Sequence, residues 1–114
     1  MNLPELLKRI RSFRDERDWA QFHNAKDMAA ALAIEASELQ EIFLWKAGSE
    51  IEETATKKRS EIEDELADIA VYLLELADNL EIDLEAAIVA KLAKNAEKYP
   101  VEKARGSSAK YTEL

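Results

Sequence analysis

Apolar side chains recur every three or four residues along most of this chain, a spacing typical of amphipathic helices. Together with helix-capping residue types at the segment ends, the spacing predicts four helices over about residues 3–17, 24–46, 58–80 and 83–99. Asn2, Asn24 and Asp83 are the predicted N-caps, because short polar side chains accept hydrogen bonds from free N–H groups at helix starts. The pattern therefore predicts an all-α, four-helix bundle.

The segments between these helices are predicted to be irregular. Residues 18–24 form an aromatic and polar loop, and residues 49–56 form a polar, acidic one after a helix stop near Gly48. Tyr99 should be extended because it precedes Pro100, and the tail from Val101 onward should be irregular.

The second and third predicted helices are apolar on more than one side. Ile34 and Leu44 lie away from the main stripe of the second helix, as do Val71 and Leu74 on the third. A helix with apolar residues nearly all round is buried on more than one side. In a chain of 114 residues the second side is expected to meet another copy, giving a homo-dimer or homo-tetramer.

Composition narrows the class of protein. The length of 114 residues suits a single domain, residues 1–114, and two Gly and two Pro favour long helices. There is no cysteine and only one histidine, His23, which excludes thiolate and multi-histidine metal sites. The net charge of −8 disfavours nucleic-acid binding, and no stretch has membrane-spanning length. A cytoplasmic location is therefore expected.

Two acidic pairs occupy matching positions on the second and third helices. Glu35 lies inside the apolar arc of its helix and Glu38 at the edge of that arc, and Glu65 and Asp68 are placed in the same way on theirs. Packed core to core, the two helices would bring four carboxylates together. Such a cluster needs counter-charge, and a hard divalent cation such as Mg²⁺ supplies it. The alternative is a set of ordinary rim acids paired with lysines.

These pairs form the motif E35-A-S-E38 followed by E65-L-A-D68. The motif resembles the signature of the MazG-like all-α nucleoside triphosphate pyrophosphatases. The segments RDWAQFH (17–23), LWK (44–46), KLAKNAEKYP (91–100) and SSAKYTEL (107–114) are similar to the dCTP pyrophosphatase branch of that family. The resemblance covers nearly the whole chain.

The resemblance implies a Mg²⁺ site, with Mn²⁺ as a substitute, held by Glu35, Glu38, Glu65 and Asp68. It further implies a set of substrate-binding residues, in which the tail with Lys110 and Tyr111 closes the site: Trp19, His23, Trp45, Tyr72, Lys91, Asn95 and Lys110. Without the resemblance, the indoles would be core or interface aromatics, His23 a loop hydrogen-bonder, Lys91 a solvated lysine and Tyr72 a partner of the acids. One departure is Ile10, where some relatives carry a histidine.

The reaction implied by the resemblance hydrolyses a nucleoside triphosphate, with dCTP expected, to the monophosphate and pyrophosphate. Glu38 is the expected general base. Two other readings stay open. One is a non-catalytic helical oligomerisation or regulatory module, and the other is a pyrophosphohydrolase for a different nucleotide, such as phosphoribosyl-ATP or a modified dNTP.

Overall fold

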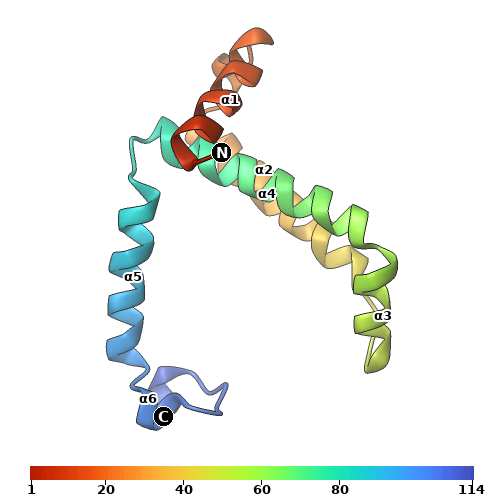
Figure 1. The fold of residues 1–114 in the computed structure, drawn as a ribbon, viewed down its shortest axis with the longest axis vertical. Helices are drawn as coiled ribbons and strands as arrows, with labels where there is room; N and C mark the ends of the chain where they lie inside the picture. The colour runs from red at the N-terminus through yellow and green to blue at the C-terminus, as the bar shows by residue number, and fades with distance from the viewer. The chain divides into compact units, whose positions relative to one another are not determined.

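The computed structural model describes residues 1–114, and every regular element in it is a helix (Figure 1). The predicted all-α class is therefore confirmed. None of the helices combines the length and apolar character that crossing a lipid bilayer requires. The elements in chain order are α1 (Leu3–Glu16), η1 (Ala20–Phe22), α2 (Ala25–Ile42), α3 (Ser49–Lys57), α4 (Arg59–Asn79), α5 (Leu84–Lys98), α6 (Val101–Ala104) and η2 (Tyr111–Glu113).

All three predicted N-caps are confirmed. The side chain of Asn2 accepts a hydrogen bond from Glu5 N at 3.0 Å, and that of Asn24 accepts one from Asp27 N at 2.9 Å. Asp83 caps α5 in the same way, through Ala86 N at 3.1 Å. Each cap satisfies an N–H group that has no partner inside its helix, so the helix begins where the capping residue stands.

The region after α2 differs from the prediction. α2 ends at Ile42 rather than near Lys46, and Trp45 has a φ of 67°, in the left-handed region that a helix cannot contain. The predicted loop 49–56 is instead the helix α3, which follows Gly48 at a φ of 58°. Acidic side chains in its first turn favour α3, and within it the Thr54 hydroxyl donates to Glu50 O at 2.7 Å.

The C-terminal part also needs correction. The predicted irregular tail contains the short helix α6 after Pro100 and the 3₁₀ turn η2. The chain divides into two compact units, residues 1–81 and residues 82–114. The fourth predicted helix, α5, lies in the second unit, so the bundle within the first unit is made by α1, α2, α3 and α4 instead of the four helices predicted.

Within the first unit α4 is the central helix. α2 packs along it as an antiparallel partner over most of its length, and α1 and α3 also contact it (Figure 1). Ile10, Met28 and Ala77 form the small buried apolar core, in which Met28 is the most enclosed. At the C-terminal end of α4, Arg11 Nε donates to Asp78 Oδ2 at 2.7 Å, which ties α1 to α4 and holds the pKa of Asp78 below its ordinary value.

The second unit consists of α5, α6 and η2. Its tail folds back on the end of α5, where the rings of Tyr99 and Tyr111 meet edge to face with centroids 5.9 Å apart. Lys98 Nζ lies 4.8 Å from the centroid of the Tyr111 ring. Both contacts give the tail a defined place against α5.

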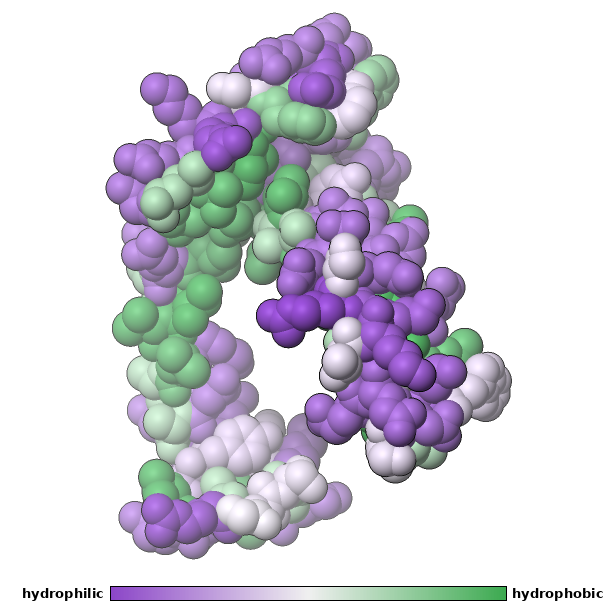
Figure 2. Space-filling view, turned by 45° about the vertical axis from the view of Figure 1, so that its right-hand side comes forward, coloured by the Kyte–Doolittle hydropathy of each residue, from purple (hydrophilic) through white to green (hydrophobic).

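Many large apolar side chains remain exposed. In the space-filling view, green apolar atoms reach the surface at several places between purple hydrophilic ones (Figure 2). Leu66 of α4 and Leu80, which directly follows that helix, are each 51% exposed. Single exposed leucines are common, whereas larger contiguous apolar patches mark contact sites. The exposed faces are consistent with the predicted contact with another copy.

Candidate metal centre and adjoining cavities

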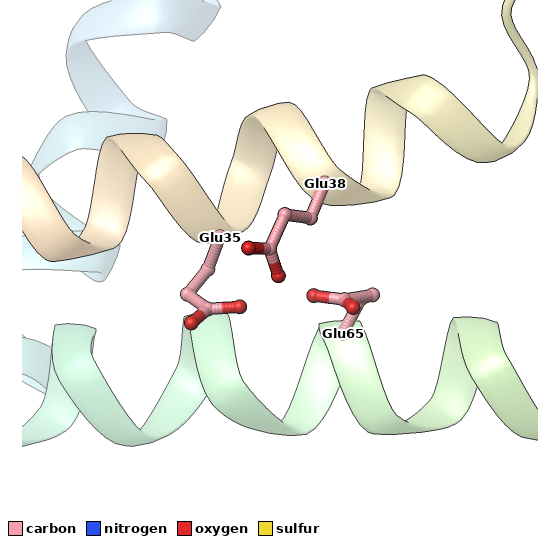
Figure 3. Close-up of side chains that lie close together, drawn as sticks. All are labelled: Glu35, Glu38 and Glu65. Carbon is pink, nitrogen blue, oxygen red and sulfur yellow. The ribbon is translucent and has the colours of Figure 1, made fainter.

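Three carboxylates meet between α2 and α4. Glu35 and Glu38 project from α2 and Glu65 projects from α4, and the three carboxyl groups point toward one another (Figure 3). One oxygen from each lies within 4.8 Å of the others. The i, i+3 spacing puts the first two on one face of α2, and the antiparallel packing of α2 on α4 supplies the third.

The cluster contains buried oxygens without a protein partner. Glu35 Oε2 and Glu65 Oε2 are both inaccessible to solvent and accept no hydrogen bond. Burial raises the pKa of Glu35 from 4.5 to about 7, and hydrogen bonding to Glu38 and Glu65 and the charge of Asp68 add to the shift. Burial also raises the pKa of Glu65. Ionising these carboxyl groups in the metal-free protein therefore costs free energy.

These residues fit a hard divalent cation. An oxygen-only donor set with several carboxylates is what Mg²⁺ and Mn²⁺ bind, and a cation would give the two unpartnered oxygens a ligand. The rim-acid alternative requires lysine partners, and neither Glu35 nor Glu65 makes an ion pair within 4.0 Å. The identity of the metal stays a prediction.

Asp68 stands beside this group without joining it. Its charge contributes to the raised pKa values of Glu35 and Glu65, and its side chain lines a neighbouring cavity. Tyr72, one turn further along α4, is half-buried, and burial followed by the charge of Glu35 raises the pKa of its hydroxyl. The structure thus brings three of the four predicted ligands together and places Asp68 and Tyr72 next to them.

A charged cavity of about 630 Å³ opens on one side of the cluster. Glu38 and Glu65 line it together with Lys46 and Lys58, and its other acidic residues are Glu41, Glu61 and Asp64. The lining thus carries five carboxylates against two ammonium groups. Without added cations, such a lining repels a polyphosphate. With one or two divalent cations it becomes able to accept one.

An aromatic cavity of about 460 Å³ opens on the other side, where Asp68 lies. Trp19 and His23, two of the residues predicted to bind substrate, both line it, and their ring centroids are 6.1 Å apart. Phe13 of α1 packs edge to face on Trp19 at 5.9 Å and supports the indole. Ile10 is a buried apolar part of the same lining.

Two groups of lining residues were not predicted from the sequence. Lys46 and Lys58 flank the charged cavity, and Glu75 and Arg14 lie behind His23 in the aromatic one. A sequence signal exists for Glu75, because it continues the series 65, 68, 72 and 75 along one face of α4. No comparable signal marks the lysines.

The other predicted substrate-binding residues are not gathered at these cavities within the first unit. Trp45 is 88% exposed and does not line the cavity that holds Trp19. Lys91 and Asn95 stand one turn apart on one face of α5, and Lys110 precedes η2. These three belong to the second unit, and their part in the site stays a prediction.

The raised pKa of Glu35 predicts how stability depends on pH. Between about pH 4.5 and about pH 7 the folded, metal-free chain keeps a proton on Glu35 that the unfolded chain releases. The stabilisation of the folded chain by this proton is fully present below pH 4.5 and is lost as the pH rises toward 7. The free energy of unfolding therefore falls as the pH rises across that window. Thermal melts should show a flatter pH profile for Glu35→Gln than for wild type. Identical slopes would exclude Glu35 as the titrating group.

The sequence and the fold of this chain are both similar to those of known proteins. The model of the MazG-like family matches residues 30–114. The chain is 40% identical over 113 residues to dCTP pyrophosphatase 1 of Rattus norvegicus and 39% identical to that of Homo sapiens. Each alignment covers 96% of this chain and 66% of the relative, so the chain spans about two thirds of their length. The crystal structure of a pyrophosphatase from Archaeoglobus fulgidus superposes with a TM-score of 0.82 at 43% identity, covering 85% of this chain and 91% of that one.

Proposed function

Because the chain belongs to the MazG-like family, we propose that it is a metal-dependent pyrophosphohydrolase that converts a nucleoside triphosphate, dCTP foremost, into the monophosphate and pyrophosphate. The observation that carries this proposal is the three-glutamate cluster with its two unpartnered buried oxygens. The cluster lies between an aromatic cavity and a charged one, which is the order of base, reacting phosphates and leaving group in such a substrate.

The two cavities suggest how the nucleotide is placed. In the aromatic cavity the base stacks on Trp19, and stacking of a base on an aromatic ring contributes about 1–3 kcal/mol in single-stranded nucleic-acid sites. The triphosphate then extends past Asp68 and the three glutamates toward Lys46 and Lys58. These lysines offset charge on the departing pyrophosphate.

Glu35, Glu38, Glu65 and Asp68 would hold the cation, Mg²⁺ or Mn²⁺. When bound, it neutralises phosphate charge and acts as a Lewis acid. Glu38 is the least enclosed of the three clustered glutamates, and we assign it the general-base role. Its carboxylate takes a proton from water as the water oxygen bonds to phosphorus, the bond to the bridging oxygen breaks, and pyrophosphate leaves with the electron pair.

A comparison of substrates tests this function. With Mg²⁺, pyrophosphate release should be faster from dCTP than from dGTP or dTTP when compared as kcat/KM. Stacking tolerates any base, so the preference must come from hydrogen bonds to the base edge and from the width of the aromatic cavity. Equal kcat/KM for all four dNTPs would refute the claim that the aromatic cavity selects the base, but it would not refute the hydrolase activity. No pyrophosphate from any nucleotide would refute the function itself.

The site is expected to be completed by a second copy. Trp45 does not line the cavity that holds Trp19, and Leu66 of α4 is half exposed. We therefore expect a homo-dimer or a homo-tetramer at micromolar concentration, measured by light scattering. A monomer under those conditions would remove Trp45 from the site.

The alternative of a non-catalytic helical module gives no role to the two buried, unpartnered glutamate oxygens. A different nucleotide, such as phosphoribosyl-ATP or a modified dNTP, keeps the same site and changes only the occupant of the aromatic cavity. The substrate panel separates these readings. A cytoplasmic location and the absence of nucleic-acid binding stay predictions.

A further inference from the structure

In the wall of the aromatic cavity, the buried carboxylate of Glu75 contacts His23, the only histidine of the chain. Glu75 is 3% exposed, and its Oε1 lies 2.7 Å from His23 Nδ1. The guanidinium of Arg14, itself largely buried, forms an ion pair with the same oxygen at 3.7 Å. An ionised carboxylate only accepts hydrogen bonds, so Nδ1 must be the donor.

The backbone at His23 is held by the same group of residues. Asn79 Nδ2 donates to His23 O at 3.3 Å, and Asn79 Oδ1 accepts from an Arg14 terminal nitrogen at 3.0 Å. Ring and backbone of His23 are thus both anchored to α4, through Glu75 and Asn79. The loop 18–24 carries His23 on residues that otherwise have little buried surface, so these bonds fix where the imidazole lies.

We propose that Glu75 is a positioning residue that holds His23 in the Nδ1–H tautomer, so that Nε2 accepts a hydrogen bond from the bound nucleoside. The inference rests on the proposed function, because it needs a nucleoside in the aromatic cavity. With Nδ1–H committed to Glu75, Nε2 of the neutral imidazole is an acceptor only. It therefore pairs with an N–H or O–H group, and it repels a carbonyl oxygen in the same place.

A nucleoside offers two donors of this kind, the exocyclic amino group of the base and a sugar hydroxyl. Trp19 lies beside His23 on the same wall, so a base stacked on the indole would bring its edge near the imidazole. Pairing with the amino group would favour cytosine over uracil or thymine, which carry a carbonyl at that position. Pairing with the hydroxyl would favour an intact sugar over a dideoxy sugar.

The single histidine makes the tautomer directly measurable. In protein labelled with ¹⁵N at the imidazole, each ring nitrogen gives one signal, whose shift reports whether it carries hydrogen. At about pH 8, above the usual titration range of histidine, Nδ1 should be protonated and Nε2 not. A protonated Nε2 with a bare Nδ1 in the wild-type protein would overturn the proposal.

Titration with deoxycytidine monophosphate then tests the contact, because the product carries the nucleoside without being turned over. The Nε2 signal should move toward the protonated position as the site fills. Deoxyuridine monophosphate lacks the amino group and dideoxycytidine monophosphate lacks the sugar hydroxyl, so the one that abolishes the movement identifies the donor. No movement with deoxycytidine monophosphate at saturation, or movement retained with both analogues, would overturn the assignment.

Variants separate positioning from general stability. Glu75→Leu removes the acceptor, and the tautomer should lose its Nδ1–H preference while KM for dCTP rises about tenfold, the effect of one hydrogen bond. Asp78→Asn is the matched control, because Asp78 also pairs α4 with an arginine of α1 but has no contact with His23. An unchanged tautomer in folded Glu75→Leu, or an equal change in Asp78→Asn, would overturn the role of Glu75.

The nitrogen shifts of the wild-type protein test the Nδ1–H tautomer of His23 even if Glu75→Leu does not fold. They also separate this inference from the proposed function. Pyrophosphate release with a protonated Nε2 would overturn the inference alone. If the nitrogen shifts show the predicted tautomer and contact but no nucleotide yields pyrophosphate, the proposed hydrolase function is wrong and the nucleoside contact stands.

Discussion

Glu65→Gln is expected to lower kcat/KM for dCTP at least about 100-fold, the scale of lost transition-state charge stabilisation. Glu65 is the only cluster member on α4, and its Oε2 is one of the two buried oxygens without a partner. A glutamine in its place offers a weaker, neutral ligand, so the cation that neutralises phosphate charge binds poorly. Glu35→Gln, Glu38→Gln and Asp68→Asn should show losses of the same order.

The control for these variants is Glu63→Gln. Glu63 lies on the same helix, is 62% exposed and pairs with Arg59 at 3.1 Å on the solvent side. Its replacement removes the same charge at a distance from the cluster and should leave kcat/KM within about twofold of wild type, because exposed ion pairs contribute little. Full activity in Glu65→Gln would remove that residue from the site, and an equal loss in both variants would indicate a non-specific effect of charge.

Removal of divalent metal should abolish pyrophosphate release. The charged cavity presents five carboxylates and two lysines, so it repels a triphosphate unless cations intervene. After chelation and gel filtration, activity should be undetectable, and Mg²⁺ or Mn²⁺ should restore it fully. Hydrolysis that persists in the metal-free protein would show that the glutamates act without a cation. Failure of both metals to restore activity would indicate a different ion.

Much of the fold could be predicted because helix starts are locally encoded. Asn2, Asn24 and Asp83 each precede an apolar periodic run, and each caps a helix in the structure. The pairing of α2 with α4 follows from their matching apolar stripes. Packing of those stripes brings Glu35, Glu38 and Glu65 together as predicted, whereas Asp68, one turn further along α4, stays beside the group.

The errors lie where local signals are weak. α3 carries two threonines and three glutamates and lacks a clear apolar stripe, so its helical pattern is weak in the sequence. α2 ends early because Trp45 adopts a left-handed conformation, which sequence gives no reason to expect for an indole. The place of Trp45 relative to a base could therefore not be predicted within one chain.

The contact between His23 and Glu75 could not be predicted for a different reason. The two residues are 52 positions apart, and their distance depends on the path of the loop 18–24 against α4. Helical periodicity places Glu75 on the face of Asp68 and Tyr72, but only tertiary packing decides whether a loop histidine reaches it. The acid cluster follows from two helices, whereas this contact follows from a loop docked on a helix.

The most direct test of the account is the identity of the products from dCTP. Wild-type protein with Mg²⁺ should convert dCTP into equal amounts of dCMP and pyrophosphate, separated by ion-exchange chromatography, and Glu65→Gln should yield almost none. That result would place cleavage between the α and β phosphates at the glutamate cluster. Release of dCDP and inorganic phosphate, or no turnover of dCTP by the wild-type protein, would contradict it.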